Sequence, residues 1–410
     1  MDAVDHYQKK TKWGVLLTNI LSEPLFALYN LISYILKGEL GATPIQIAVL
    51  MMLRPTVSIL SLYWSANLHE RSDRLKSNLL GAGFLGRMLF LFLPFYQEIW
   101  FVILAAAVYL LFYRAGIPAW LEILKLNLPN KSREKIFALG SAIGFLECAI
   151  LGIIFGKIMD NNPGSWQILF FLSALLGMLN LVFLSRIPIN QVLEDTIETK
   201  NKGTFFEQII KPWKESFSLV RSNFEFARFQ WGFMLSGVGI MLVQPTLPVF
   251  FQDRLHLSYT DIFIGLTFFK SLGFAISSPI WGRMLNRYWI NELSSWVFFM
   301  VGFFPFLLLL APLGRNWMYL AFFFYGIAQG GSHLIWNMSG PIFSGSKNSA
   351  MFSNVNIIMV GLRGMVAPIL GGILATYFGS MTVLVLGGGF CFYGSYWMIR
   401  SKKSSKVTSL

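Results

Sequence analysis

Charged residues are scarce in this chain. Only 13% of its 410 residues are Asp, Glu, Lys or Arg, and 55% are hydrophobic, whereas soluble domains carry about 25% charged residues. This composition excludes an ordinary soluble domain and is typical of a membrane protein. Cysteine is scarcer still. Cys148 and Cys391 each lie in an apolar run, which excludes a disulfide framework and a Cys/His zinc site.

The sequence also lacks the signatures of an enzyme. It contains no nucleophile–base cluster, P-loop, metal-ligand spacing or ATP-binding segment, so we expect neither catalysis nor a cofactor or metal. The net charge of +13 does not indicate nucleic-acid binding, because the basic residues gather in alternate loops between apolar runs. That distribution is typical of the cytoplasmic loops of membrane proteins.

Apolar runs long enough to cross a bilayer dominate the chain. About 20 apolar residues span the hydrocarbon, and the first run, after the polar segment 1–13, exceeds a signal-peptide core and lacks a cleavage site. The sequence therefore predicts an all-α membrane protein. Its twelve predicted spans are 13–36, 44–67, 77–95, 99–118, 135–158, 166–186, 228–251, 259–281, 292–312, 316–339, 348–375 and 379–399.

The basic residues predict the orientation of these spans. If the N-terminus is cytoplasmic, the outside segments hold only Lys37, Lys157, Arg254 and Arg315, and the remaining loop cations lie inside. Cytoplasmic loops carry the excess of Lys and Arg. We therefore expect both termini inside, in a multi-pass protein of the plasma membrane, here a bacterial inner membrane.

The one long connection, 187–227, divides the runs into two sets of six. Its polar part, 190–203, is followed by apolar residues at helical spacing from Phe205 to Val220. This stripe predicts an amphipathic helix on the inner membrane face, and a plain linker is the alternative. The expected domains are an N-terminal six-helix bundle over 1–187, the linker over 188–227 and a C-terminal six-helix bundle over 228–410.

An internal repeat supports the two bundles. At an offset of 217 residues, Leu40, Thr43, Ile45 and Trp64 match Leu257, Thr260, Ile262 and Trp281. At an offset of 216, the matches are Trp120 with Trp336, Gly156 with Gly372 and Glu147 with Arg363. Two segments with nearly the same offset indicate a duplication.

Twelve spans, a six-plus-six repeat and a central loop resemble the major facilitator superfamily over nearly the whole chain. After the eighth run, the stretch with Gly282, Arg283, Asn286 and Arg287 resembles its G-x-L-x-D-R-x-G gating loop, with Asn286 at the acidic position. The loop after the second run matches this motif poorly, and the antiporter glycine–proline signature of the fifth run is incomplete. The resemblance implies transport by alternating access, with spans 1, 4, 7 and 10 lining a cavity flanked by spans 2, 5, 8 and 11.

Seven ionisable residues lie deep within the apolar runs. Each is costly there unless it faces protein, water or substrate, and only Arg87 falls on a span outside the cavity-lining and flanking sets. The seven are Glu23, Arg54, Arg87, Arg114, Glu147, Lys270 and Arg363.

We assign candidate roles from depth and chemistry. The midplane cations favour an anionic or zwitterionic substrate, so the predicted substrate-binding residues are Arg54, Lys270, Arg363, Gln244 and Asn337. Glu23, beside Pro24 in a first span predicted to be broken there, and Glu147 are the predicted proton-coupling residues. The alternatives are a structural Glu147–Arg363 ion pair, snorkelling of Arg114 and packing of Arg87 against glycines.

The sequence thus predicts a secondary transporter of a small organic anion or zwitterion that is coupled to protons. An exporter of amphipathic drugs and a non-cycling, transporter-like sensor are the alternatives. The expected partners are the small-molecule substrate, protons and membrane lipids, with no nucleic acid, and the expected state is a monomer.

The topology can be tested by cysteine labelling. A cysteine at Asn162 should react with an impermeant reagent applied outside, and one at Lys202 should not, because basic loops stay in the cytoplasm. Labelling of position 202 from outside would contradict the twelve-span topology.

Overall fold

In a computed structural model, the chain is described over residues 2–65, 74–189, 205–344 and 349–401, and all regular structure in these ranges is helical. By their contacts the residues form two compact units. Unit 1 comprises residues 1–42, 56–197 and 257–264, and unit 2 comprises residues 43–55, 198–256 and 265–410. Each unit is described by itself below.

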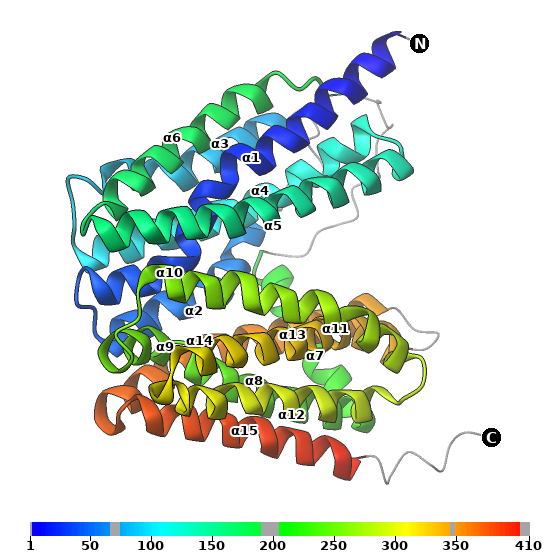
Figure 1. Ribbon diagram of the computed structural model, residues 1–410. Helices are drawn as coiled ribbons and strands as arrows, with labels where there is room; N and C mark the ends of the chain where they lie inside the picture. Colours follow the sequence, from blue (N-terminus) through cyan, green and yellow to red (C-terminus); the bar gives the residue numbers. More distant parts are fainter. Residues whose placement is uncertain (1, 66–73, 190–204, 345–348, 402–410) are drawn as a thin grey trace. The chain divides into compact units, whose positions relative to one another are not determined.

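Unit 1 is a bundle in which α1 is the central helix (Figure 1). α1 packs on α4, α5 and α6, α3 packs on α4 and α6, and α10 packs on α5. The bounds are α1 (Asp2–Gly38), α3 (Leu75–Met88), α4 (Ile99–Asn127), α5 (Asn130–Asn161), α6 (Trp166–Ser185) and α10 (Tyr259–Phe263). A short 3-10 turn, Leu89–Phe92, extends α3.

Unit 2 is a second bundle, built around α8 and α13. α8 packs on α14 and α15, and α13 packs on α11, α12 and α14. The bounds are α7 (Phe205–Ser222), α8 (Phe224–Val243), α9 (Thr246–Val249), α11 (Lys270–Leu285), α12 (Ile290–Leu309), α13 (Arg315–Ser344), α14 (Ser349–Phe378) and α15 (Ser380–Ser401). Residues 43–55, at the start of α2 (Pro44–Ser65), also belong to this unit.

A helix falls on each of the twelve predicted apolar runs. Among the described residues, eight helices are long and apolar enough to cross a membrane, including α1, α4, α6 and the joined helix Tyr259–Leu285. The twelve-span count stays a prediction. The predicted end of the fourth run at 118 is wrong, because α4 continues through Pro118 to Asn127.

The two Pro-containing segments singled out in the sequence behave differently. α1 runs without interruption through Pro24, so the expected break of the first helix beside Glu23 is wrong. Neighbouring helices can support a proline within a membrane helix, because they satisfy the freed backbone groups. In the seventh run, α8 does end at Val243, and Gln244 and Pro245 form a turn before α9.

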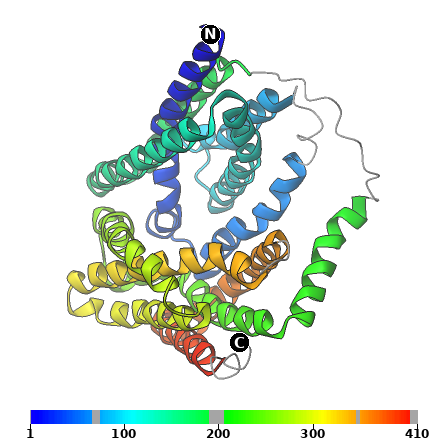
Figure 2. The same ribbon diagram turned by 90° about the vertical axis from the view of Figure 1, so that its right-hand side faces the viewer.

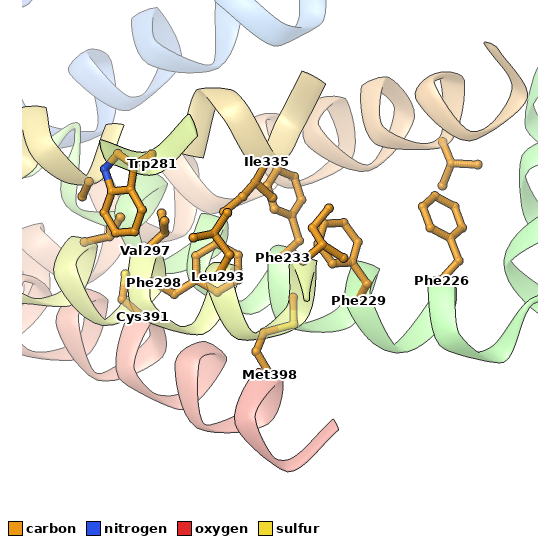
Figure 3. Close-up of a cluster of buried hydrophobic side chains, with 14 of the residues drawn as sticks. Phe226, Phe229, Phe233, Trp281, Leu293, Val297, Phe298, Ile335, Cys391 and Met398 are labelled. Carbon is orange, nitrogen blue, oxygen red and sulfur yellow. The ribbon is translucent and has the colours of Figure 1, made fainter. Parts of the chain in front are cut away.

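The core of unit 2 is aromatic. Phe226, Phe229 and Phe233 lie along one face of α8, where Figure 3 shows them pointing toward side chains of the neighbouring helices. Trp281 of α11, Leu293 and Phe298 of α12, and Ile335 of α13 complete the cluster, with Cys391 and Met398 of α15.

α7 occupies the predicted amphipathic stripe. It packs on α14 and leads into α8 (Figure 2). At this junction the Asn223 side chain accepts the Phe226 N–H. Leu219 and Val220 pack against the aromatic core, whereas Lys214 and Phe217 are exposed. One face of α7 is therefore held by protein, and contact of the other face with the membrane remains a prediction.

Three buried polar side chains connect α8, α13 and α14. The Gln230 amide donates to Asn356 Oδ1, and Asn356 Nδ2 donates to Ser339 Oγ at 2.7 Å. All three residues are at most 2% exposed. Such hydrogen bonds contribute to helix association in membranes because an unpaired polar group there has no water to bind.

Replacing the central member of this trio should destabilise the fold. Asn356→Leu removes the acceptor of the Gln230 amide and one donor to the Ser339 hydroxyl, which still donates to the Trp336 carbonyl, at a cost of about 1–2 kcal/mol. We expect a lower thermal unfolding midpoint in detergent, whereas Ile357→Ala, at an exposed neighbouring position of α14, should change it little. Equal midpoints for Asn356→Leu and the parent would contradict this role.

Candidate functional site

Two carboxylates meet along the α1–α5 contact of unit 1. Glu23 Oε2 lies 3.2 Å from the position that a Cβ on Gly144 would occupy. The Cys148 thiol forms a hydrogen bond with the Glu23 carboxylate, and Glu147 lies close enough for its charge to act on Glu23. Both glutamates are half-buried. The two predicted proton-coupling residues therefore share one location.

A tyrosine cluster on α1 and α4 lies near Glu23. Tyr109 of α4 is within electrostatic range of both Glu23 and Arg87. Its ring lies 5.4 Å from that of Tyr29 and 5.7 Å from that of Tyr113. Tyr109 thus interacts with both the Glu23 carboxyl group of α1 and the Arg87 cation of α3.

Arg87 is held by polar groups of its own unit. Its guanidinium donates to the Gly83 carbonyl at 2.8 Å and to Ser22 Oγ at 3.0 Å. Asn180, fully buried on α6, donates to the same Ser22 hydroxyl at 3.2 Å. A Cβ on Gly177 would collide with Arg87, so the glycine leaves room for it. These contacts explain how this helix carries a charge. Of the neighbouring glycines Gly81, Gly83 and Gly86 on which the packing interpretation rests, Gly83 contacts Arg87.

Arg363 has a comparable setting in unit 2. Its guanidinium donates to the Phe233 carbonyl and lies 4.4 Å from the centroid of the Phe233 ring. Gly237, one turn further along α8, has no side chain that would collide with it. Arg363 is 9% exposed, and its Nε has no hydrogen-bond partner among the described residues.

The other two predicted substrate cations are more accessible. Arg54 is exposed on α2, next to Pro55, and lies within electrostatic range of Tyr325 on α13. Lys270 is half-buried at the start of α11, directly after a π-helical turn, Ile264–Phe269. The Lys270 carbonyl lies against Gly326, which fixes the α11 backbone closely on α13.

The two remaining predicted substrate-binding residues, Gln244 and Asn337, are neutral and lie on or beside helices of unit 2. Gln244 is half-buried in the turn between α8 and α9. Asn337 is exposed on α13 and donates to the carbonyl of His333 on its own helix at 2.8 Å. Trp336 contacts the Phe233 ring, with 5.9 Å between centroids.

The predicted gating motif lies at the end of α11. Gly282 and Arg283 belong to its last turn, Asn286 follows as the cap residue, and the Arg287 N–H donates to the Met284 carbonyl at 3.0 Å. Arg283, Asn286 and Arg287 are exposed. The motif is thus a helix end followed by a turn, and its gating role stays a prediction.

The sequence analysis did not single out Tyr109, Tyr325 or Asn180. Tyrosine is common in membrane helices, so Tyr109 and Tyr325 gave no signal before their neighbours were known. Asn180 could have been identified from the sequence, because an amide side chain within the apolar run 166–186 needs a polar partner.

Several solved transporter structures are similar to this structure over nearly the whole chain. The nucleoside transporter NupG has a similar structure, with a TM-score of 0.70 and 14% identity over 96% of this chain and 100% of that one. A bacterial homologue of the human lysosomal transporter Spinster gives 0.65 and 12%, over 96% and 98%. The peptide transporter POT, in complex with sulfate, gives 0.70 and 13%, over 96% and 94%. At these identities the likeness shows the fold. A search of curated proteins finds no match.

A match to a protein-family model identifies the family, which structural likeness at these identities does not. This model is that of the Major Facilitator Superfamily, and it matches residues 15–350, more than half of the chain. The match includes the helices that carry the carboxylate pair and the cations Arg54, Arg87 and Lys270. The chain is a multi-pass membrane transporter that belongs to the Major Facilitator Superfamily.

Proposed function

We propose that this transporter moves a small organic anion or zwitterion by alternating access and that proton binding drives the movement. The observation that carries the proposal is the exposure of Arg54. This residue lies ten positions into α2, about 15 Å along the helix. A cation at that depth is costly when it faces lipid, so we expect its exposed part to face a polar environment that substrate can enter, beside its interaction with Tyr325.

The other cations of unit 2 support the same substrate class. Lys270 is half-buried near the middle of the joined helix Tyr259–Leu285, and Arg363 presents a buried Nε that no described residue accepts. Carboxylate and phosphate groups are the preferred partners of such guanidinium edges, because two parallel hydrogen bonds can form. Gln244 and Asn337 are proposed to add neutral hydrogen bonds that orient the substrate.

The carboxylates of unit 1 support proton coupling. Glu23 and Glu147 lie close together, with Tyr109 in electrostatic range of Glu23, and a pair of neighbouring carboxylates resists double ionisation. A proton can therefore be taken up there without an added cation. Glu23 is the first candidate, because it also contacts Cys148 and lies against Gly144.

A ligand screen would identify the substrate. The three structural neighbours are named for nucleosides, lysosomal transport and peptides, so the panel should contain nucleosides, dipeptides, small carboxylates and organic phosphates. A bound ligand raises the unfolding midpoint by mass action. Uptake of each hit into proteoliposomes would then separate transport from sensing, and inhibition of drug accumulation in cells would favour the exporter instead.

Arg54 and Lys270 provide the test of the anion site. Arg54→Ala and Lys270→Ala should each weaken binding of the identified substrate by about tenfold or more, because a charge-assisted hydrogen bond is worth about 1.5–3 kcal/mol. Binding is measured by isothermal titration. Arg186→Ala removes an exposed cation at the end of α6 and serves as the control. Unchanged affinity in both site variants would overturn the proposed anion site.

Glu23 provides the test of coupling. Glu23→Gln keeps the size and hydrogen-bonding capacity of the neutral acid but cannot ionise. We expect substrate exchange across proteoliposomes to continue, whereas accumulation driven by a proton gradient should be lost. Glu147→Gln is measured in parallel. Accumulation at the parental level with unaltered pH dependence would remove Glu23 from the mechanism.

A further inference from the structure

One continuous helix is divided between the two units. It runs from Tyr259 to Leu285 and comprises α10, the π-helical turn Ile264–Phe269 and α11. Residues 257–264 belong to unit 1, and residues from 265 onward belong to unit 2. The division therefore falls at the start of the π-helical turn. Such turns are rare and occur mostly as single irregular turns within helices, often at functional sites.

The start of this helix is bound by a carboxylate of another helix. Asp160, in the last turn of α5, accepts the Tyr259 N–H at 2.7 Å and the Thr260 N–H at 3.0 Å. It also accepts the Thr260 hydroxyl at 2.6 Å. The first N–H groups of a helix have no partner within the helix, and a negative charge there is further stabilised by the helix dipole.

A second carboxylate strengthens the same contact. Glu39, directly after α1, accepts the Tyr259 hydroxyl at 3.2 Å and the Gly164 N–H at 3.0 Å. Glu39 thus joins the end of α1, the loop after α5 and the start of α10. All of these residues belong to unit 1.

Glycine allows the backbones to approach closely at this point. A Cβ on Gly156 of α5 would lie 2.8 Å from the Thr260 Cα and 2.9 Å from the Thr260 nitrogen. Any larger residue would push the helix start away from Asp160. Gly152, one turn earlier, faces the Phe263 ring in the same way.

We propose that Asp160 is a gating residue that holds the first turn of the helix Tyr259–Leu285 on α5 and must release it during each transport cycle. The helix is covalently continuous, so any movement of unit 2 away from unit 1 must either bend the helix at Ile264–Phe269 or break the Asp160 contact. This inference rests on the proposed function only in that a transporter has to open. In the predicted topology, the contact lies on the outer side of the membrane.

The contact itself is tested by hydrogen–deuterium exchange of the purified full-length protein. Asp160→Ala removes all three acceptor interactions, and Asp160→Asn keeps one neutral acceptor. We expect the Tyr259 and Thr260 amides to exchange roughly tenfold faster in Asp160→Ala and to an intermediate extent in Asp160→Asn, in line with the cost of losing a helix cap. Glu98→Gln is the matched control, because Glu98 precedes α4 but makes no side-chain cap hydrogen bond.

Gating is tested by the distance between spin labels at Asn162→Cys and Arg254→Cys, with the native cysteines replaced by alanine. Both positions are exposed, Asn162 in unit 1 and Arg254 in unit 2. Asp160→Ala should raise the ratio of longer to shorter distances about tenfold relative to Glu98→Gln. If the amides exchange faster but the distance distribution is unchanged, Asp160 caps the helix without gating, and the proposal is overturned.

A second variant distinguishes loss of the Asp160 contact from a general folding defect. Thr260→Val removes one donor to Asp160 and keeps the carboxylate and the side-chain volume, so it should shift the distances in the same direction but less. Identical distance distributions for Thr260→Val, Asp160→Ala and the parent would also overturn the proposal. The distances require no substrate, so this outcome is independent of whether the proposed substrate class is right.

Discussion

Placing a charge in the hydrocarbon of a bilayer costs about 2.5–3.5 kcal/mol at the helix centre on insertion scales, and this chain carries seven ionisable residues deep in its apolar runs. The described arginines among them have two kinds of environment. Arg87 and Arg363 are enclosed, each between a carbonyl acceptor and a glycine on a neighbouring helix. Arg54 is exposed instead. The two enclosed arginines are thus held by groups of their own unit, whereas the side chain of Arg54 keeps an exposed surface.

The same constraint explains why glycine matters in both units. Gly177 and Gly237 leave space for arginine side chains, and Gly156 leaves space for the backbone of Thr260. Gly372 is the repeat mate of Gly156. A Cβ on Gly372 would lie 2.8 Å from the Pro44 carbonyl oxygen, so the glycine lets the backbone of α2 approach closely. Small residues that let helices approach closely are typical of membrane-helix contacts. The repeat seen in the sequence is therefore also a repeat of contacts.

Much of the fold was predictable from the sequence, because hydropathy and length alone locate helices in a membrane protein. The errors lie at prolines: Pro118 does not end α4 and Pro24 does not break α1, since packing against neighbours overrides local preference. The candidate site was predictable only in part. The pattern identified Glu23 and Glu147 separately, but their proximity depends on how α1 and α5 pack, and the tyrosine partners have no sequence signal.

The start of α2 at Thr43 and the start of α10 at Thr260 are repeat mates, and they differ in how their first amides are capped. The start of α2 is capped locally, since Thr43 donates to Gln46 Oε1 and accepts the Gln46 N–H. This cap moves with α2 and needs no group of a neighbouring helix. The start of α10 gives two amides to Asp160 of another helix, and its own cap, Ser258, satisfies only the Asp261 N–H. Releasing α10 therefore breaks its hydrogen bonds to Asp160, whereas the Thr43–Gln46 cap stays with α2 on release. If Asp160 gates as proposed, this asymmetry makes the Asp160 contact contribute more to the free-energy cost of opening than the Thr43–Gln46 cap does.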